Sequence, residues 1–130
     1  MPFVHLRAAG APLSSEQTQT LQHGLTDLMD KVLRKNPQLT SVLVEQTPVQ
    51  GWSIGDARVA RAAHLDVKVT SGTNTAEEKA RFVARAHALM TQILGTLPDA
   101  TYVVVHEIAA DAWGYGGETQ AQRALRAKAA

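Results

Sequence analysis

The chain has 130 residues, of which 45% are apolar, and its formal net charge at pH 7 is +1. That size and composition predict one globular domain with its own core, and the interspersed charges exclude the basic face with which proteins neutralise a phosphate backbone, so we expect no nucleic-acid partner. Because the sequence contains no cysteine, disulfides and cysteine-based metal sites are excluded, and the composition fits a reducing compartment.

The first stretch of the chain joins a proline at the second position directly to a predicted strand. Residues Phe3 to Ala8 alternate the apolar Val4 and Leu6 with other side chains, which is typical of a half-buried strand. The stretch lacks a charged and apolar leader, and no segment reaches the ~20 apolar residues that span a bilayer. We therefore expect a cytoplasmic protein without a membrane partner.

Pro2 is the first candidate for chemistry. A small second residue normally allows the initiator Met1 to be removed, and the mature chain would then begin with a free prolyl amine. An α-amino group titrates near ~8, and burial beside apolar groups lowers the pKa of an amine further. Pro2 is therefore a candidate general base that is neutral at pH 7 and that can return the proton it takes.

The next stretch predicts one long helix. Ser14 stands three residues ahead of Gln17, which is the spacing of a capping box. Asn36 and Pro37 are expected to end the helix. Between these signals, apolar residues recur at intervals of three and four, as on one buried helix face: Leu21, Leu25, Leu28, Met29, Val32 and Leu33.

A strand and a turn-rich loop complete the first half, and the same order of elements then repeats. The β-branched run from Ser41 to Glu45 predicts the strand, and the loop from Thr47 to Asp56 carries Trp52 and Ile54. Thr119 to Ala130 is expected to form a terminal helix or packing arm. The second half offers the corresponding elements in order: a strand over 63–70, a helix that starts with a capping box over 75–78, a strand over 101–108 and an aromatic, Gly-rich loop over 109–118.

The two halves match as a tandem duplication with a period near ~60 residues. Val-Leu-Val-Glu at 42–45, followed by the Trp52 loop, matches Val-Val-His-Glu at 104–107, followed by the Trp113 loop. Each half is a βαβ unit, whose two strands are parallel with a right-handed crossover. We therefore predict an α/β (α+β) fold in which two tandem βαβ units form a four-stranded sheet with two helices on one face.

The duplication also predicts the domain organisation. A half of ~60 residues would bury only ~60% of its surface and be marginal alone, so we expect a single domain over 1–130, with a first repeat over 1–58 and a second repeat plus C-terminal arm over 59–130. Parallel strands are normally covered on both sides, and copies of the same chain are the simplest cover for the second sheet face. That face is expected to carry His5, Arg7, Asp66 and Lys68.

Four short motifs give the chain a resemblance to a known family. They are Pro2 after Met1, Ser-Ser-Glu-Gln at 14–17, Leu-Thr-Ser-Val at 39–42 and Trp-Gly-Tyr-Gly-Gly-Glu at 113–118. With them the chain resembles the 4-oxalocrotonate tautomerase superfamily over nearly its whole length, and the duplication resembles the fused members. The resemblance implies a tautomerase/MIF-like fold, a homotrimer, no cofactor, and an N-terminal proline that works as general base or acid or forms an imine.

The resemblance also implies roles for several side chains. Trp113 and Tyr115 would form the aromatic wall beside Pro2, although large aromatics in a Gly-rich loop also serve as interface contacts. Trp52 and Ile54 of the first loop would line a vestigial counterpart of that site. Glu107 stands where some hydrating relatives keep a water-activating carboxylate, and the alternative for Glu107 is an ion pair at the end of a strand.

The chain departs from the family in the arginines that hold an oxo-acid substrate. A desolvated carboxylate is usually met by a bidentate arginine. Arg61 is a candidate replacement, with Arg58, Arg7 and Lys68 as others, and Asn74 is a candidate ligand whose simpler role is a turn or cap. The positions that would hold the arginines are occupied by Pro12 and Leu13 in the first loop, Leu43 and Tyr102 on the strands, and Thr73 and Asn74 in the second loop.

These observations lead to one expected function and two alternatives. We expect a cofactor-independent keto-enol tautomerase that acts on a small enol or 2-oxo acid, with Pro2 moving the proton. The alternatives are a related Pro-dependent decarboxylase, hydratase or dehalogenase, and a non-catalytic trimeric ligand-binding protein. No metal site is expected, because His5, His64 and His106 lie on strands without ligand spacing or a carboxylate motif.

Overall fold

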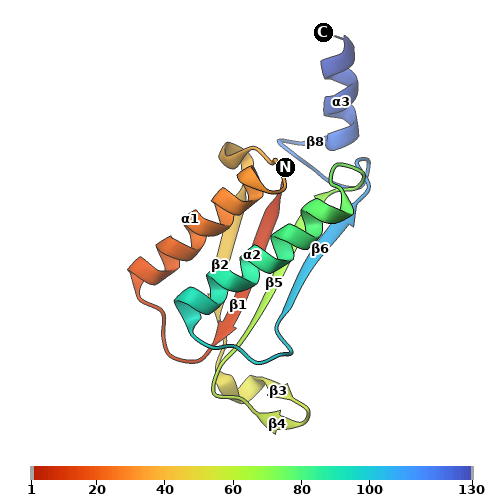
Figure 1. Cartoon of the computed structure of the whole chain (residues 1–130). Coiled ribbons are helices and arrows are strands. Elements are labelled where there is room, and N and C mark those ends of the chain that lie inside the picture. Colours follow the sequence, from red (N-terminus) through yellow and green to blue (C-terminus); the bar gives the residue numbers. More distant parts are fainter. Residues whose placement is uncertain (1, 130) are drawn as a thin grey trace.

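A computed structural model describes residues 2–129 and has two layers, a four-stranded sheet and two long helices on one of its faces (Figure 1). The strand order is β2–β1–β5–β6, in which β1 pairs with β2 and β5 pairs with β6 in parallel, and β1 pairs with β5 in antiparallel. The predicted sheet of two βαβ units is therefore confirmed. The strands are β1 (Phe3–Ala9), β2 (Ser41–Gln46), β5 (Ala62–Thr70) and β6 (Tyr102–Ile108).

Both long helices begin at the predicted capping boxes. Helix α1 spans Ser15–Lys31 after the N-cap Ser14, and α2 spans Ala76–Leu94 after the N-cap Thr75. The predicted end of the first helix at Asn36 and Pro37 is wrong, because the helix stops at Lys31 and the backbone of Arg34 takes a left-handed conformation with φ of 58°. Val32 and Leu33 still reach the core from this turn, which explains why their spacing imitated a longer helix. None of the helices in the described part of the chain is long and apolar enough to cross a bilayer.

The core lies between the sheet and the two helices and draws on both halves. Val4 and Leu6 of β1 alternate into it from one half, and Leu65 and Val67 of β5 do so from the other. Phe82 on α2 is fully buried in the same cluster. Because the two antiparallel central strands share one apolar layer, the halves are packed as one body rather than as two separate cores.

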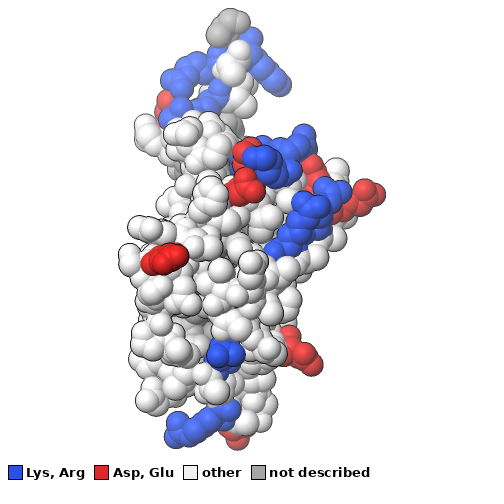
Figure 2. All heavy atoms as spheres, turned by 60° about the vertical axis from the view of Figure 1, so that its left-hand side comes forward, with Lys and Arg blue, Asp and Glu red and all other residues white. Residues whose placement is uncertain are grey.

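A short hairpin follows each outer strand, and the two hairpins lie at opposite ends of the sheet (Figure 1). The sequence predicted turn-rich loops here but not these strands, which are only two residues long. After the second hairpin, α3 (Gln120–Ala129) projects away from the body, and its basic side chains stand at the top of Figure 2. The remaining elements are η1 (Pro37–Leu39), η2 (Val49–Gly51), β3 (Ser53–Ile54), β4 (Ala57–Arg58), β7 (Gly114–Tyr115) and β8 (Glu118–Thr119).

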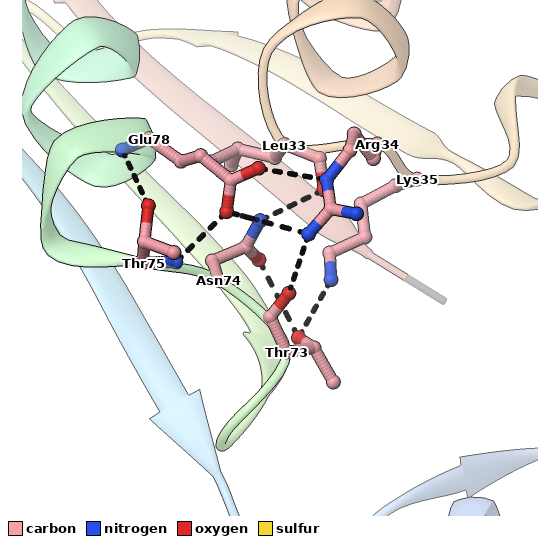
Figure 3. A network of polar contacts seen from close by, with 7 residues as sticks. All are labelled: Leu33, Arg34, Lys35, Thr73, Asn74, Thr75 and Glu78. Carbon is pink, nitrogen blue, oxygen red and sulfur yellow. Dashed lines mark hydrogen bonds and ion pairs between the residues drawn. The ribbon is translucent and has the colours of Figure 1, made fainter.

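A polar network joins the end of α1 to the start of α2 (Figure 3). The Arg34 Nε donates to Glu78 Oε2 at 2.7 Å. The Asn74 side-chain amide donates to the Leu33 carbonyl at 2.9 Å and to Glu78 Oε1 at 3.3 Å. Asn74 thus holds the turn ahead of α2 against the chain that leaves α1, which is the turn role that the sequence offered as its simpler alternative.

The network predicts a pH-dependent contribution of Glu78 to stability. The Thr75 backbone N–H and the Arg34 guanidinium lower the pKa of Glu78 to about 2. A carboxylate whose pKa is lower in the folded chain stabilises it fully above the unfolded pKa of ~4.3, and this contribution is lost as the pH falls towards ~2. We expect Glu78→Gln to lower the melting temperature at pH 7, and the difference from the native chain to shrink steadily between pH ~5 and ~2.

Thermal melts followed by circular dichroism at pH 7, 5, 4 and 3 measure this difference. Glu77→Gln is the matched control, because Glu77 is the exposed neighbour in the same helix turn and should change the melting temperature little at any of these values. A Glu78→Gln difference that stays constant from pH 7 to 3 would contradict the assignment.

Candidate functional site

Pro2 is buried and stands immediately before β1. Its carbonyl accepts a hydrogen bond from the Ser41 amide N–H, with an N···O distance of 3.2 Å. This bond extends the ladder between β1 and β2 by one step, so the sheet fixes the position of Pro2. The expected removal of Met1 concerns a position outside the described residues.

The aromatic loop of the second half lies at the same end of the sheet as Pro2 (Figure 1). Phe3 pairs with Lys68 on the antiparallel β5, so the last residues of β5 lie beside the start of β1. Thr70 ends β5, and its Oγ1 accepts a hydrogen bond from the Trp113 indole Nε1 at 3.1 Å. The half-buried Trp113 ring is therefore anchored at the end of the sheet where Pro2 lies.

Tyr115 is held by the terminal helix. The Arg123 guanidinium carbon lies 3.7 Å from the centre of the Tyr115 ring, and Arg123 Nη2 donates to the Tyr115 carbonyl at 2.8 Å. Glu118 pairs with Arg126 at 2.9 Å. Only a packing role was predicted for this arm, so Arg123 was missed. Its signal was a cation in the first turn of the terminal helix, eight residues after the aromatic Tyr115.

Of the cations considered as replacements for the missing arginines, Lys68 is one that the structure brings to the Pro2 end. Its Nζ lies 5.8 Å from the centre of the Phe3 ring, and Phe3 directly follows Pro2. Arg61 and Arg58, by contrast, lie at the other end, because Ala62 pairs with Ala9 at the end of β1. Arg61 donates there to the Thr96 carbonyl at 3.2 Å. Within one chain, Arg61 and Pro2 are thus separated by the length of β1.

Glu107 is engaged in an ion pair. Its Oε1 lies 2.7 Å from Lys79 Nζ, and the hydrogen bond from Lys79 lowers the pKa of the Glu107 carboxyl. Glu107 follows His106 on β6 and pairs in register with Val69. The side chain that was considered as a water-activating group therefore has the contact that the alternative, an ion pair, requires.

The open face of the sheet carries a chain of charged and imidazole groups. Asp66 accepts from His106 Nε2 at 2.6 Å and lies 3.0 Å from His64 Nε2. Desolvation raises the pKa of Asp66, but the hydrogen bonds from these two histidines together lower it by more, so the net shift of this pKa is downward. His5 bonds to Glu45, and its hydrogen bond lowers the pKa of that carboxyl. Across residues 2–129, no three or more His, Cys, Asp or Glu side chains form a group that could hold a metal ion.

Trp52 and Ile54 line a groove of about 640 Å³ at the end of the sheet opposite to Pro2. The first hairpin forms one wall of this groove, and the exposed Tyr102 at the start of β6 forms another. Arg7, Ala63 and His64 complete it from the two central strands. Both residues of the first loop therefore line an open groove, which is formed at the ends of β1 and β6 that lie away from Pro2.

The strand registers fix the relation between the two halves at 61 residues. Phe3 pairs with Ser41 in the first half, and His64 pairs with Tyr102 in the same way in the second half. The same offset of 61 residues relates Trp52 to Trp113. In this register Ala63 is the counterpart of Pro2. The offset in the predicted match of 42–45 with 104–107 is therefore one residue too long, because Leu43 corresponds to Val104 and Glu45 to His106. Tyr102, which was named with Leu43 as an arginine position, corresponds to Ser41.

Comparisons with known proteins agree with this architecture. The model of a family described as "Tautomerase enzyme" matches residues 2–62 and again 64–123. The probable tautomerase K2 of Dickeya dadantii is 33% identical over 63 residues, which are 48% of this chain and 94% of that protein. It therefore corresponds to about one half of the duplication.

Two solved structures share the fold. The structure of Pt0534 inactivated by 2-oxo-3-pentynoate superposes with a TM-score of 0.83 at 16% identity, over 92% of this chain and 98% of that one. A wild-type fused 4-OT, solved as a symmetric trimer, superposes with a TM-score of 0.83 at 15% identity, over 92% of this chain and 96% of that one. The tandem sheet with two helices is thus the fold of fused 4-OT proteins.

Proposed function

Because the chain belongs to the tautomerase family, whose model matches both of its halves, we propose that it is a cofactor-independent keto-enol tautomerase. The substrate is a small enol or 2-oxo acid, and the amine of Pro2 is the general base and acid. The observation that carries this proposal is that Pro2 is buried and fixed by the first hydrogen bond of the β1–β2 ladder.

The proposed reaction needs only one titrating group. The lone pair of the prolyl nitrogen takes the hydroxyl proton of the enol, and the C=C electrons accept a proton at carbon as the C=O bond forms. The same amine gives back what it took, so no proton is gained or lost overall. Burial lowers the pKa of an amine, which keeps the nitrogen neutral and basic at pH 7. Trp113 and Tyr115 are proposed to form the pocket wall.

Lys68 is proposed to receive the carboxylate of the substrate. It lies beside the residue that follows Pro2, whereas the other candidates, Arg61, Arg58 and Arg7, lie towards the far end of the sheet. A lysine acts as a compact point charge and lacks the fixed fork of an arginine. The site should therefore accept 2-oxo acids with weaker geometric selection than an arginine pair would impose.

We propose a homotrimer located in the cytoplasm as the working form. A fused 4-OT of the same fold forms a symmetric trimer, and one chain leaves the sheet face around Asp66 and Glu45 without the second cover that parallel strands usually have. The cysteine-free sequence supports the cytoplasmic location.

Three measurements on the native chain test the proposed function. Intact mass shows whether Met1 is removed, ultraviolet decay of phenylenolpyruvate measures ketonisation, and incubation with 2-oxo-3-pentynoate followed by peptide mapping locates the modified residue. We expect a chain without Met1, faster decay than in buffer, and a label on Pro2, because a neutral secondary amine adds to a conjugated alkyne. Unchanged decay with specific ligand binding would instead favour a non-catalytic trimeric protein, which the missing arginines would explain.

Glu107→Gln is expected to lower kcat/KM for ketonisation by less than about tenfold. The Glu107 carboxylate is bound by Lys79 and has a lowered pKa, which makes it a poor base. Steady-state kinetics with phenylenolpyruvate measure the effect. Lys79→Met is the matched control and should reproduce it, since either variant breaks the same ion pair. A loss of ~100-fold or more in Glu107→Gln alone would make Glu107 a catalytic residue and favour a hydratase.

A further inference from the structure

We propose that the groove beside the first hairpin is a second small-molecule site, which binds a small aromatic carboxylate without converting it. The groove is lined by Trp52, Tyr102 and Arg7 among others, and Ala63 stands in it where the duplication would place a second Pro2. This inference concerns the end of the sheet that the proposed reaction does not use.

The duplication gives the groove the shape of an active site, but it supplies no counterpart of the proposed general base Pro2. By the relation of 61 residues, the first hairpin lies at the Ala63 end of the sheet as the second hairpin lies at the Pro2 end. Ala63 lies inside β5, and its side chain is almost fully buried. Its nitrogen is part of a peptide bond and carries no basic lone pair. A ligand in this groove therefore meets no group equivalent to a prolyl amine.

The size and walls of the groove fit a small planar ligand. Its volume of about 640 Å³ lies in the range of pockets that hold small molecules. In a single chain Tyr102 is 64% exposed, although it is a large hydrophobic residue. Trp52 faces the same groove from the hairpin. Two aromatic surfaces around one cavity favour a flat apolar ligand that stacks on a ring.

The charged lining of the groove favours a carboxylate on that ligand. The Arg7 side chain is 58% exposed, and its Nε lies 3.5 Å from Glu45. Glu45 has a second partner in His5, and Glu45 is the acidic partner of Arg7 among residues 2–129. The guanidinium of Arg7 carries further N–H groups that can donate to a carboxylate in the paired geometry that guanidinium groups favour. His64 lines the groove beside Arg7, and its Nε2 lies 3.0 Å from Asp66 Oδ2.

The two ends of the sheet differ in the residues that would recognise a ligand. Arg7 corresponds to Lys68 at the Pro2 end, and Tyr102 corresponds to Ser41. The groove therefore combines an arginine with an exposed aromatic ring at positions where the Pro2 end has a lysine and a serine. This difference makes the groove the more selective end for an aromatic acid, since an arginine fork fixes the carboxylate while the ring fixes the plane of the ligand.

Titration of the full chain with phenylacetate tests the proposal. The sequence has two tryptophans, so Trp113→Phe leaves Trp52 as the single indole reporter. We expect a saturable change in its emission, and we expect Arg7→Gln in the same background to weaken binding about tenfold or more, as removal of a charged hydrogen-bond donor does. Lys68→Gln is the matched control at the other end and should leave this affinity unchanged.

Two further variants keep the test decisive. Ala100→Phe adds a ring to the groove lining without removing a polar contact, so it should block the groove and abolish the emission change. This variant carries the test if the melting temperature of Arg7→Gln shows that its fold is disturbed. Pro2→Ala should keep the binding, which separates this site from the proposed tautomerase activity. Absence of saturation up to about 10 mM, or loss of binding in Lys68→Gln with retention in Arg7→Gln, overturns the proposal.

Discussion

Placing one glycine ahead of Pro2 is expected to lower kcat/KM for phenylenolpyruvate by about 10²–10⁴-fold, the usual contribution of a general acid or base. The inserted residue converts the prolyl amine into an amide, which has no basic lone pair. The new terminal amine then lies one residue, or ~3.8 Å, further along the chain. Phe3, Lys68 and Trp113 keep their contacts with the sheet, so the melting temperature should stay close to that of the native chain.

Pro2→Ala distinguishes the contribution of the terminal amine from that of the proline ring. Alanine is also small enough to allow removal of Met1, so a primary amine remains at the same place. It has lost the ring that fixes the direction of the lone pair, and we expect a smaller loss of activity than with the glycine insertion. Pro12→Ala, in the exposed loop before α1, is the matched control and should retain full activity. Equal rates for the native chain and the glycine insertion would end the proposed role of Pro2.

The fold could be predicted from the sequence where local signals decide it. The capping boxes at Ser14 and Thr75 start both helices in the structure, and the alternation of Val4 and Leu6 identified a strand that buries one face. These signals depend on neighbours within four residues. The prediction of where α1 ends was wrong because Leu33 lies beyond the helix but is still buried in the core. The spacing of apolar residues does not reveal whether a helix or a turn carries the buried side chain.

The site could be predicted only in part, because its geometry depends on the antiparallel contact between the halves. Nothing in the order of the residues indicates that β5 runs against β1, yet this direction separates Arg61 from Pro2 and brings Lys68 beside Phe3. The ion pair of Glu107 also joins a strand to the helix before it, through Lys79. Such contacts between distant residues are decided by packing, which the residue pattern does not encode.

Phe82→Ala is expected to lower the free energy of unfolding by about 3–5 kcal/mol, as deletion of a buried aromatic ring leaves a cavity. Phe82 is fully buried on α2, and its counterpart 61 residues earlier, Leu21 on α1, is fully buried too. The two helices pack against each other in one core. Phe82→Leu, the matched control, installs the residue type of the other half and should cost clearly less, because most of the cavity is filled.

The same variant tests whether residues 1–130 unfold as a single domain. Pro2 begins the first half and Phe82 belongs to the second, but Val4 and Leu65 join them through one apolar layer. Urea unfolding followed by circular dichroism and by ketonisation activity should therefore give one shared transition, shifted to lower urea in Phe82→Ala at equal protein concentration. If activity and the signal of one helix persisted after the first transition, the halves would be separate folding units. A single transition would mean that the environment of the Pro2 nitrogen is stabilised by a core that neither half can form alone.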